Sequence, residues 1–575
     1  MARLQPRRIL RNVAFFTIAI LLYILYSKEE VRHIEPVENV NQLVHKHNHR
    51  HRPAEKLFVD EFWVPEKALK EHERDGQPGE GGHPVETSSE DVNKRDEAYR
   101  DYGFNQFVSD KISLNRTIPD TRPPACKSSK YERYLLKASV VVIFHNEGWS
   151  TLMRTVNSVL NRSPPSMLKE IVLVDDFSDK DHLKNELQSH VAKLNKVRLL
   201  RSKERLGLIR ARMLGASNAR GDVVIVLDSH CEVNQGWLPP LLAPISEDEH
   251  VVTCPIIDFI DHDTFQYKPM GSFIRGTFNW RFDYKERELT KEQMNRRKDE
   301  TEEVWSPVMA GGLFAISRQF FNKLGQYDPG MEVWGGEQYE LSFKIWMCGG
   351  RMANMPCSRV GHVYRRNVPY SYPKSNAVVI NFRRVAEVWM DDYKEWLYER
   401  RPELKEVRNY GDISDRLALR KRLKCHSFKW YMQNVLNDTV RQNYEPLRGS
   451  GLIRNPNSNL CLDTRGRKPG SEMGLSTCLS YSWSQKFQYS YIYELRNTED
   501  CLDGPNYEAG SKISLYRCHE MQGNQEFHYT EAKTILHKVS GMCVSVGVNG
   551  NGPVLDNCNG KPEQIWELNL AKLKS

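Results

Sequence analysis

The C-terminal part of this 575-residue chain contains a threefold repeat, and no other feature of the sequence restricts the fold as strongly. Each copy carries two cysteines followed by a glutamine and an aromatic residue: Cys461, Cys478 and Gln485-Lys-Phe487; Cys501, Cys518 and Gln525-Glu-Phe527; Cys543, Cys558 and Gln564-Ile-Trp566. Three aligned copies predict a domain built from three similar units. Because a unit of about 40 residues buries little apolar surface alone, we expect each copy to be closed by its own disulfide.

The N-terminus predicts a membrane anchor. Residues 1–11 carry four arginines, and residues 12–27 carry no charge. The uncharged stretch ends in Tyr-Ser-Lys-Glu-Glu rather than in the small residues of a cleavage site, which favours an uncleaved anchor over a signal peptide. It is shorter than the roughly 20 residues of a typical span, as suits a thin early-secretory membrane. The arginines place residues 1–11 in the cytosol, so we expect a single-pass type II protein whose bulk is lumenal.

Composition narrows the function classes. Residues 28–100 are polar and predict a flexible stem. A lumenal address places the twelve cysteines in an oxidising compartment, where most should pair, and the lack of CxxC spacing argues against a zinc ribbon. Asn115, Asn161 and Asn437 begin glycosylation sequons. The net charge of +8 arises from 82 basic and 74 acidic residues that are interspersed, so we expect no nucleic-acid partner.

Apolar runs that alternate with helical segments predict an α/β domain upstream of the repeats. Residues 138–144, 170–174 and 223–227 read as buried strands, and 150–160 and 208–219 have helical spacing. This alternation predicts a parallel sheet covered by helices on both faces. Ligands of such sheets bind at the carboxyl ends of the strands, where Asp176 and Asp228 fall.

A candidate cation site begins at Asp228. His230 follows two residues later, and His362 lies in Val360-Gly361-His362-Val363-Tyr364. An aspartate and two histidines brought together by the fold would form a divalent-cation site with open positions. The alternative interpretation is a strand end that carries an ordinary hydrogen-bonded histidine.

Ordered motifs extend this pattern through the chain: Arg116-Thr-Ile-Pro-Asp-Thr-Arg122, Phe144-His-Asn-Glu147, Val174-Asp-Asp-Phe-Ser-Asp179, Asp228-Ser-His230, Ala310-Gly-Gly-Leu-Phe314, Val333-Trp-Gly-Gly-Glu337 and Cys357-Ser-Arg-Val-Gly-His362. Through them the chain, from about Ser113 onward, resembles the polypeptide N-acetylgalactosaminyltransferases, Golgi enzymes that begin mucin-type O-glycosylation. The resemblance implies a GT-A, Rossmann-like glycosyltransferase domain at 101–432, a linker at 433–446 and a ricin-type β-trefoil lectin domain at 447–572. It also implies the Golgi membrane as the location.

The resemblance also implies the roles of the site residues. Asp228, His230 and His362 would hold Mn²⁺, and Glu337 would be the catalytic acidic residue near the reacting sugar. The residues implied to contact the donor UDP-GalNAc are Asp176, Arg205, Arg212, Gly312, Trp334, Arg365 and Tyr370. For Asp176 the alternative is a helix cap after a strand. Phe278, Trp280 and Tyr364 align with the groove for the Ser/Thr-containing acceptor, and core packing is an equally weighted alternative for them.

The family retains anomeric configuration. We expect front-face attack, in which the leaving diphosphate takes the acceptor proton and Glu337 positions rather than attacks, over a double displacement. Val368 replaces a frequent histidine and Gln338 a frequent asparagine of the family. Both changes resemble the branch that prefers glycopeptide acceptors already bearing GalNAc.

The three repeats are not equivalent as sugar sites. The second carries an acid, an aromatic and amide or imidazole partners for GalNAc: Asp503, Tyr516, His519 and Asn524. The first has Leu479 after its second cysteine, and the third has Ser545 in place of the acid. The alternative is a purely structural trefoil. The family pattern implies free Cys231 and Cys254 and the disulfides Cys126–Cys357, Cys348–Cys425, Cys461–Cys478, Cys501–Cys518 and Cys543–Cys558.

Two other functions compete with a lectin-bearing transferase. A carbohydrate-binding or chaperone-like protein would have lost catalytic residues, yet Asp228, His230, His362 and Glu337 are all present. A nucleotide-sugar hydrolase is the third alternative. The sequence has neither a P-loop nor an HExxH motif, which argues against an ATPase and a zinc protease.

Overall fold

The structure is a computed structural model that describes residues 76–132, 135–289, 291–367, 369, 376–436, 448–480, 482–490, 492–497, 500–518 and 522–570. The expected cytosolic tail and anchor, most of the stem, and Val368, Tyr370 and His519 lie outside these residues. Among the described helices, none combines the length and the apolar character that a membrane crossing requires.

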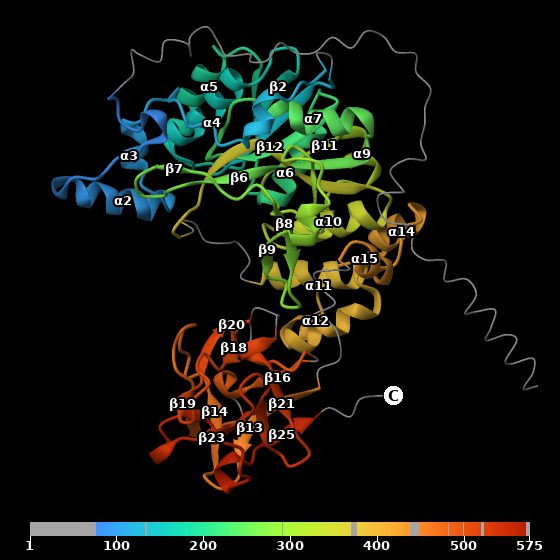
Figure 1. Ribbon diagram of the computed structural model, residues 1–575. Helices are drawn as coiled ribbons and strands as arrows, with labels where there is room; N and C mark the ends of the chain where they lie inside the picture. The colour runs from blue at the N-terminus through green and yellow to red at the C-terminus, as the bar shows by residue number, and fades with distance from the viewer. Residues whose placement is uncertain are drawn as a thin grey trace, which may run out of the picture. The chain divides into compact units, whose positions relative to one another are not determined.

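A ten-stranded mixed sheet forms the centre of the domain that precedes the repeats (Figure 1). Its main strand order is β10-β12-β6-β11-β4-β1-β2-β3, with β5 on β12 and β7 on β6. The strands are β1 Ala138–Phe144, β2 Leu168–Asp175, β3 Val197–Arg201, β4 Val223–Asp228, β5 Cys231–Val233, β6 Val251–Ile260, β7 Tyr267–Lys268, β10 Val304–Trp305, β11 Phe314–Ser317 and β12 Arg351–Val363. A separate hairpin pairs β8 Ile274–Phe278 with β9 Tyr284–Glu288.

The expected parallel sheet is correct only for part of this domain. Strands β1, β2, β3 and β4 pair in parallel, as do β6 and β12. Strand β11 lies between these two groups and is antiparallel to both β4 and β6. The sheet is therefore mixed, because a short reversed strand joins two parallel sections.

Helices cover both faces of the sheet, and the strands divide their side chains between two cores. Val141, Val172 and Val224 belong to one core, and their neighbours Val142 and Ile225 belong to the other. Since successive strand residues point to opposite faces, two buried faces require the continuous runs of valine and isoleucine seen in the sequence. Helices α4, α5 and α7 pack on one face, and α6, α9 and α10 on the other (Figure 1).

The helices have the following bounds: α2 Val92–Tyr102, α3 Gln106–Lys111, α4 Trp149–Arg162, α5 Asn185–Val191, α6 Leu208–Ser217, α7 Leu238–Glu247, α8 Lys291–Asn295, α9 Arg318–Lys323, α10 Glu337–Met347, α11 Ala377–Trp389, α12 Lys394–Arg400, α13 Pro402–Glu406, α14 Ser414–Arg422 and α15 Phe428–Asn434. Residues 76–100, expected in the stem, fold onto this domain. The buried Arg116 donates to the Gly79 carbonyl at 3.3 Å, and the Val85 amide donates to the Thr264 carbonyl at 2.9 Å.

A buried ion pair fixes β6 against β12, the strand that carries His362. The Arg359 guanidinium bonds the Asp258 carboxylate, and neither side chain is exposed. Arg359 donates as well to the Met270 carbonyl at 2.7 Å. We expect Arg359→Ala to lower the free energy of unfolding by about 3–5 kcal/mol, because it leaves a buried carboxylate unpaired. Urea unfolding of the full-length chain measures this; a loss below about 1 kcal/mol would contradict it.

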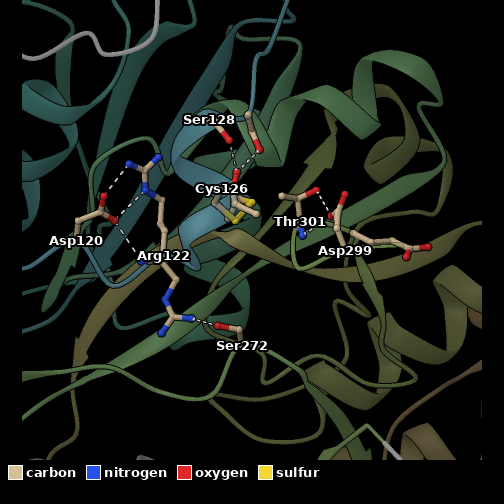
Figure 2. Close-up of a disulfide and its surroundings, with 12 residues drawn as sticks. Asp120, Arg122, Cys126, Ser128, Ser272, Asp299 and Thr301 are labelled. Atoms are coloured by element: carbon tan, nitrogen blue, oxygen red, sulfur yellow. Dashed lines mark hydrogen bonds and ion pairs between the residues drawn. A yellow bond between two sulfur atoms is a disulfide. The ribbon is translucent and has the colours of Figure 1, made fainter. Parts of the chain in front are cut away.

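Two disulfides tie distant segments of the domain that precedes the repeats. Cys126 pairs with Cys357 and Cys348 pairs with Cys425, as the family pattern implies. Figure 2 shows the first beside Arg122, which donates to the Asp120 carboxylate at 2.9 and 2.8 Å. Cys231 and Cys254 are free and buried.

Over their described residues, the C-terminal repeats form thirteen short strands around one core. They are β13 Gly449–Asn455, β14 Leu460–Asp463, β15 Gly474–Thr477, β16 Phe487–Tyr489, β17 Leu495–Asn497, β18 Asp500–Asp503, β19 Ser511–Lys512, β20 Ser514–Arg517, β21 Phe527–Tyr529, β22 Ile535–His537, β23 Met542–Val546, β24 Pro553–Asp556 and β25 Glu567–Leu570.

The repeated sequence signature has a structural cause. Disulfides join Cys461 to Cys478, Cys501 to Cys518 and Cys543 to Cys558, one within each repeat. The recurring aromatics Phe487, Phe527 and Trp566 are buried in the common core. Each repeat therefore contributes one aromatic to a core that no single copy could form, and its disulfide closes the local hairpin.

Candidate active site

The parallel strands bring several acidic residues to one edge of the sheet. In the pairing of β1 with its neighbours, Ile143 lies opposite Asp228 and Phe144 lies opposite Asp175. Glu147, Asp176 and Asp228 therefore follow three strand ends at the same level. This edge is where ligands of open α/β sheets bind.

Asp228, His230 and His362 meet at this edge. Their ligand atoms all lie within 4.8 Å of one another, and the His362 Nε2 is 3.3 Å from the Asp228 Oδ2. The antiparallel pairing of β5 with β12 sets His362 opposite Cys231, the residue after His230. Among the described residues, the buried His362 Nδ1 has no hydrogen-bond partner. One oxygen and two nitrogen donors with an unsatisfied ring nitrogen fit a divalent transition metal.

The local electrostatics keep these groups in the forms that bind a metal. Burial opposes ionisation of Asp228, but the hydrogen bond with His362 and the Arg212 charge outweigh it and hold its pKa well below the ordinary range. Burial and the nearby Arg365 guanidinium lower the pKa of His230. At neutral pH the site therefore offers a carboxylate and a neutral imidazole at positions 228 and 230.

Arg212 links the cation site to Glu337. From α6 it donates to the Asp228 Oδ1 at 3.2 Å and to the Gly311 carbonyl at 2.8 Å, and its Nη1 lies 3.6 Å from the Glu337 Oε1. Arg212 is 2% exposed, so these contacts are shielded from water. One buried guanidinium thus fixes the spacing of two carboxylates.

Glu337 begins α10 directly after two glycines with positive φ. Gly335 and Gly336 have φ of 96° and 89°, a conformation that strains other residues. The Gly335 amide donates to the Glu337 Oε2 at 2.7 Å. Burial raises the pKa of Glu337, while the Arg212 charge opposes that shift. The carboxylate is therefore held rigidly and is more easily protonated than an exposed glutamate.

Asp176 organises the segment before α6. Its carboxylate accepts the Leu206 amide at 2.7 Å and the Gly207 amide at 2.9 Å, and it pairs with the Arg205 guanidinium. Asp176 is fully buried. Asp176 therefore holds the segment that leads into α6, but it caps no helix directly after its own strand, and α6 has no side-chain cap.

The other expected donor residues surround the same edge. A Cβ at Gly312 would lie 2.7 Å from the Asp228 Oδ2, so a larger residue there would displace the Asp228 carboxylate. Arg365 follows β12 and bonds the buried Glu147, whereas Trp334 is 45% exposed. Tyr370 lies outside the described residues.

Comparison with known proteins identifies the chain. The Glycosyl transferase family 2 pattern matches residues 139–325, the N-terminal domain of galactosyltransferase matches 297–367, and the ricin-type beta-trefoil lectin domain matches 449–566. Polypeptide N-acetylgalactosaminyltransferase 10 of Homo sapiens is 46% identical over 512 residues, which are 86% of this chain and 84% of the relative. The chain belongs to the polypeptide N-acetylgalactosaminyltransferase family.

Two further relatives support this assignment. N-acetylgalactosaminyltransferase 7 of Drosophila melanogaster is 48% identical over 415 residues, 70% of each chain. A crystal structure of GalNAc-T7 with UDP, GalNAc and Mn²⁺ matches with a TM-score of 0.66 and 39% identity, over 86% of this chain and 93% of that one. The expected fold class, a glycosyltransferase domain with a ricin-type lectin domain, is confirmed.

The three aromatic residues expected in the family's acceptor groove differ in exposure in this structure. Tyr364 is 42% exposed and its ring lies 4.8 Å from that of His362. Phe278 and Trp280 are buried at 3% and 2% exposure in the core shared by α10 and α11. Core packing therefore describes Phe278 and Trp280 in this structure, because neither presents an open face.

The second lectin repeat carries the most complete polar cluster. Asp503 accepts Asn524 at 2.8 Å on both carboxylate oxygens and Gln525 at 2.9 Å, while Tyr516 of β20 is 52% exposed. In the first repeat Asp463 accepts Gln485 and the Arg465 amide. His519 lies outside the described residues.

Sequence reasoning gave no role to Glu147 and Asn381. Glu147 lies in a family motif after β1, and its carboxylate bonds His230. Its position just after a buried strand could have marked it as a candidate site residue. Asn381, from α11, donates to the carbonyls of Glu332 and Gly335 and so holds the segment before Glu337. No pattern in the sequence marks Asn381, because its partners are backbone atoms of a distant loop.

Proposed function

We propose that this chain transfers GalNAc from UDP-GalNAc to serine and threonine hydroxyls of proteins, with retention of anomeric configuration. The observation that carries the proposal is the partly buried set of Asp228, His230 and His362, joined to Glu337 through Arg212, in a chain of this family. A lectin with a decayed catalytic half would not preserve this arrangement.

Mn²⁺ is the proposed ion at Asp228, His230 and His362. The mixed oxygen and nitrogen donors and the unsatisfied His362 Nδ1 fit such an ion. When bound, it acts as a Lewis acid on the diphosphate oxygens and stabilises the leaving group.

The remaining tasks fall to the protein's own side chains. Arg205 and Arg365, with Trp334 and Tyr370, bind the donor, since guanidinium groups present a fixed fork of donors to phosphate oxygens. Glu337 holds the sugar and acceptor in place near Gly312. The acceptor proton passes to the departing diphosphate on the same face, so no glutamate nucleophile is required. Tyr364 offers an aromatic wall for an extended peptide.

We also propose that the acceptor already carries GalNAc. The support is Gln338, the second residue of α10, together with Val368. A Cβ at Gly311 would lie 3.0 Å from the Gln338 Cβ, so position 338 borders the Gly311-Gly312 segment beside the cation site. A change at this position therefore alters the wall of the reaction site.

The proposed organisation places residues 1–11 in the cytosol and 12–27 in the Golgi membrane. The stem, a catalytic domain to about residue 432, a linker at 433–446 and the lectin domain at 447–572 are then lumenal. The five disulfides suit this oxidising location.

A transfer assay tests the function. The full-length chain in detergent is incubated with UDP-GalNAc, Mn²⁺ and a Thr/Pro-rich peptide that is either bare or carries one GalNAc, and mass spectrometry counts the added sugars. Transfer to the glycosylated peptide alone supports the glycopeptide preference. Equal transfer to both peptides contradicts the preference, and transfer to neither contradicts the function.

The lectin domain gives a separate expected result. We expect Asp503→Asn to weaken binding to immobilised GalNAc at least about tenfold, because a sugar site needs its acid for the hydroxyls. Asp463→Asn is the matched control, since Asp463 occupies the same position in the first repeat and should leave binding within about twofold. Loss of binding in the Asp463 variant alone would assign the site to the first repeat.

A further inference from the structure

Glu147 joins two parts of the active site that are far apart in the sequence. A single carboxylate oxygen, Oε2, accepts the Ser229 hydroxyl at 2.6 Å and the Arg365 guanidinium at 2.8 Å, and lies 3.0 Å from the His230 Nδ1. The side chain is 1% exposed. It lies between β1 and α4, so its own backbone is anchored in the core of the domain.

The contact with His230 determines which ring nitrogen faces the cation. When the Nδ1 proton is donated to a carboxylate, the Nε2 is left as the ligand and the ring cannot rotate. The turn that carries His230 is fixed independently, because Thr155 of α4 accepts the Cys231 amide at 2.9 Å and donates to the Ser229 carbonyl at 3.0 Å. Glu147 therefore controls the ring orientation rather than the fold of the turn.

The contact with Arg365 fixes a long side chain beside the same site. The Arg365 guanidinium lies 5.5 Å from the Phe104 ring, and the next amide, of Arg366, donates to the Gly103 carbonyl at 2.9 Å. A Cβ at Gly103 would lie 2.1 Å from the Asn367 carbonyl oxygen, so the backbone around Arg366 and Asn367 packs tightly against the C-terminal end of α2. The backbone is thus held by α2, and Glu147 orients the charged group.

We propose that Glu147 is a positioning residue that holds His230 and Arg365 in their binding geometry, so that one carboxylate sets the affinity for both the cation and the nucleotide diphosphate. This inference rests on the proposed function, since it takes Asp228, His230 and His362 as the cation ligands and Arg365 as a donor contact. Glu147 would touch neither the substrate nor the ion.

The test uses Glu147→Gln, which keeps the size of the side chain and removes its charge. Electron paramagnetic resonance of free Mn²⁺ measures cation affinity of the full-length chain in detergent, and calorimetry with UDP at fixed Mn²⁺ measures nucleotide affinity. We expect Mn²⁺ to bind about 10- to 100-fold more weakly, the usual effect of removing a carboxylate behind a metal-binding histidine. We expect UDP to bind more weakly as well, and an unchanged affinity for either Mn²⁺ or UDP would overturn the proposal.

Glu170 of β2 provides a matched control. It is also buried and also accepts a serine hydroxyl, an arginine and a backbone amide: Ser139 at 2.9 Å, Arg198 at 2.7 Å and the Arg220 amide at 2.8 Å. We expect Glu170→Gln to bind Mn²⁺ within about twofold of wild type. An equal loss in both variants would mean that removing any buried charge from this sheet weakens the site, and would overturn the specific role of Glu147.

A double variant tests the link to Arg365. In an Arg365→Gln background, Glu147→Gln should still weaken Mn²⁺ binding but, at Mn²⁺ concentrations that saturate every variant, should cause no further loss of UDP affinity. Independent, multiplying losses of UDP affinity would show that Glu147 does not act through Arg365. If Glu147→Gln does not fold, Glu147→Asp keeps the charge but withdraws it from His230, and wild-type Mn²⁺ affinity in that variant would overturn the proposal.

Transfer by the wild-type preparation separates the two conclusions. A wild-type chain that binds Mn²⁺ and UDP but transfers no GalNAc contradicts the proposed function and leaves the affinity tests of Glu147 intact. A wild-type chain that transfers, with a Glu147→Gln variant of normal affinities, contradicts only the role of Glu147.

Discussion

Asp228→Asn is expected to reduce GalNAc transfer by at least about 1000-fold, equivalent to roughly 4 kcal/mol of transition-state stabilisation. The substitution removes the anionic ligand of the proposed cation site and the partner of Arg212, while the side-chain volume stays nearly constant. Neutral amides are poor replacements for a carboxylate in holding a divalent ion. Transfer rates with UDP-GalNAc and Mn²⁺, together with the Mn²⁺ affinity, measure the effect.

The opposite end of the same strand supplies the control. Asp222 lies next to the first residue of β4 and accepts the Lys137 amide at 3.1 Å, at the edge of the sheet away from the cation site. We expect Asp222→Asn to transfer within about threefold of wild type. Residual transfer above about a tenth of wild type in Asp228→Asn would remove this residue from the proposed cation site.

The sequence predicts the strands of the catalytic domain well where both faces are buried. The runs at 138–144 and 223–227 become β1 and β4 with little change, because continuous valine and isoleucine are required by two cores. Strand β12 was not predicted, since it buries Arg359 and Ser358, and hydropathy gives no sign that Asp258 neutralises the arginine. The reversal of β11 likewise depends on strand order rather than on local pattern.

The sequence predicts some residues of the site and misses others. A carboxylate at a strand end can be read from the sequence, and the structure brings Asp228 to the expected edge. Which aromatics stay exposed cannot be read, because Phe278 and Tyr364 look alike until the packing of α10 decides between core and surface. Glu147 was overlooked because its importance comes from contacts with Arg365, more than two hundred positions away.

Glu337→Gln is expected to abolish transfer nearly completely while UDP still binds. The glutamine carbonyl can still accept the Gly335 amide, so the turn before α10 should persist, but the charge that faces Arg212 is lost. A charge placed rigidly in a buried site stabilises developing charge far better than an amide does. We expect transfer to fall at least about 1000-fold and UDP affinity to change by no more than about threefold.

A variant at Glu340, one turn further along α10, distinguishes a loss of catalysis from a loss of stability. It is equally buried and pairs with Lys344 at 2.6 Å instead of facing the cation site. We expect Glu340→Gln to lower the melting temperature, because it leaves a buried lysine unpaired, yet to keep transfer within about tenfold of wild type while folded. If Glu337→Gln retains wild-type turnover, or loses transfer only in proportion to its melting temperature, the carboxylate of Glu337 has no role in the reaction.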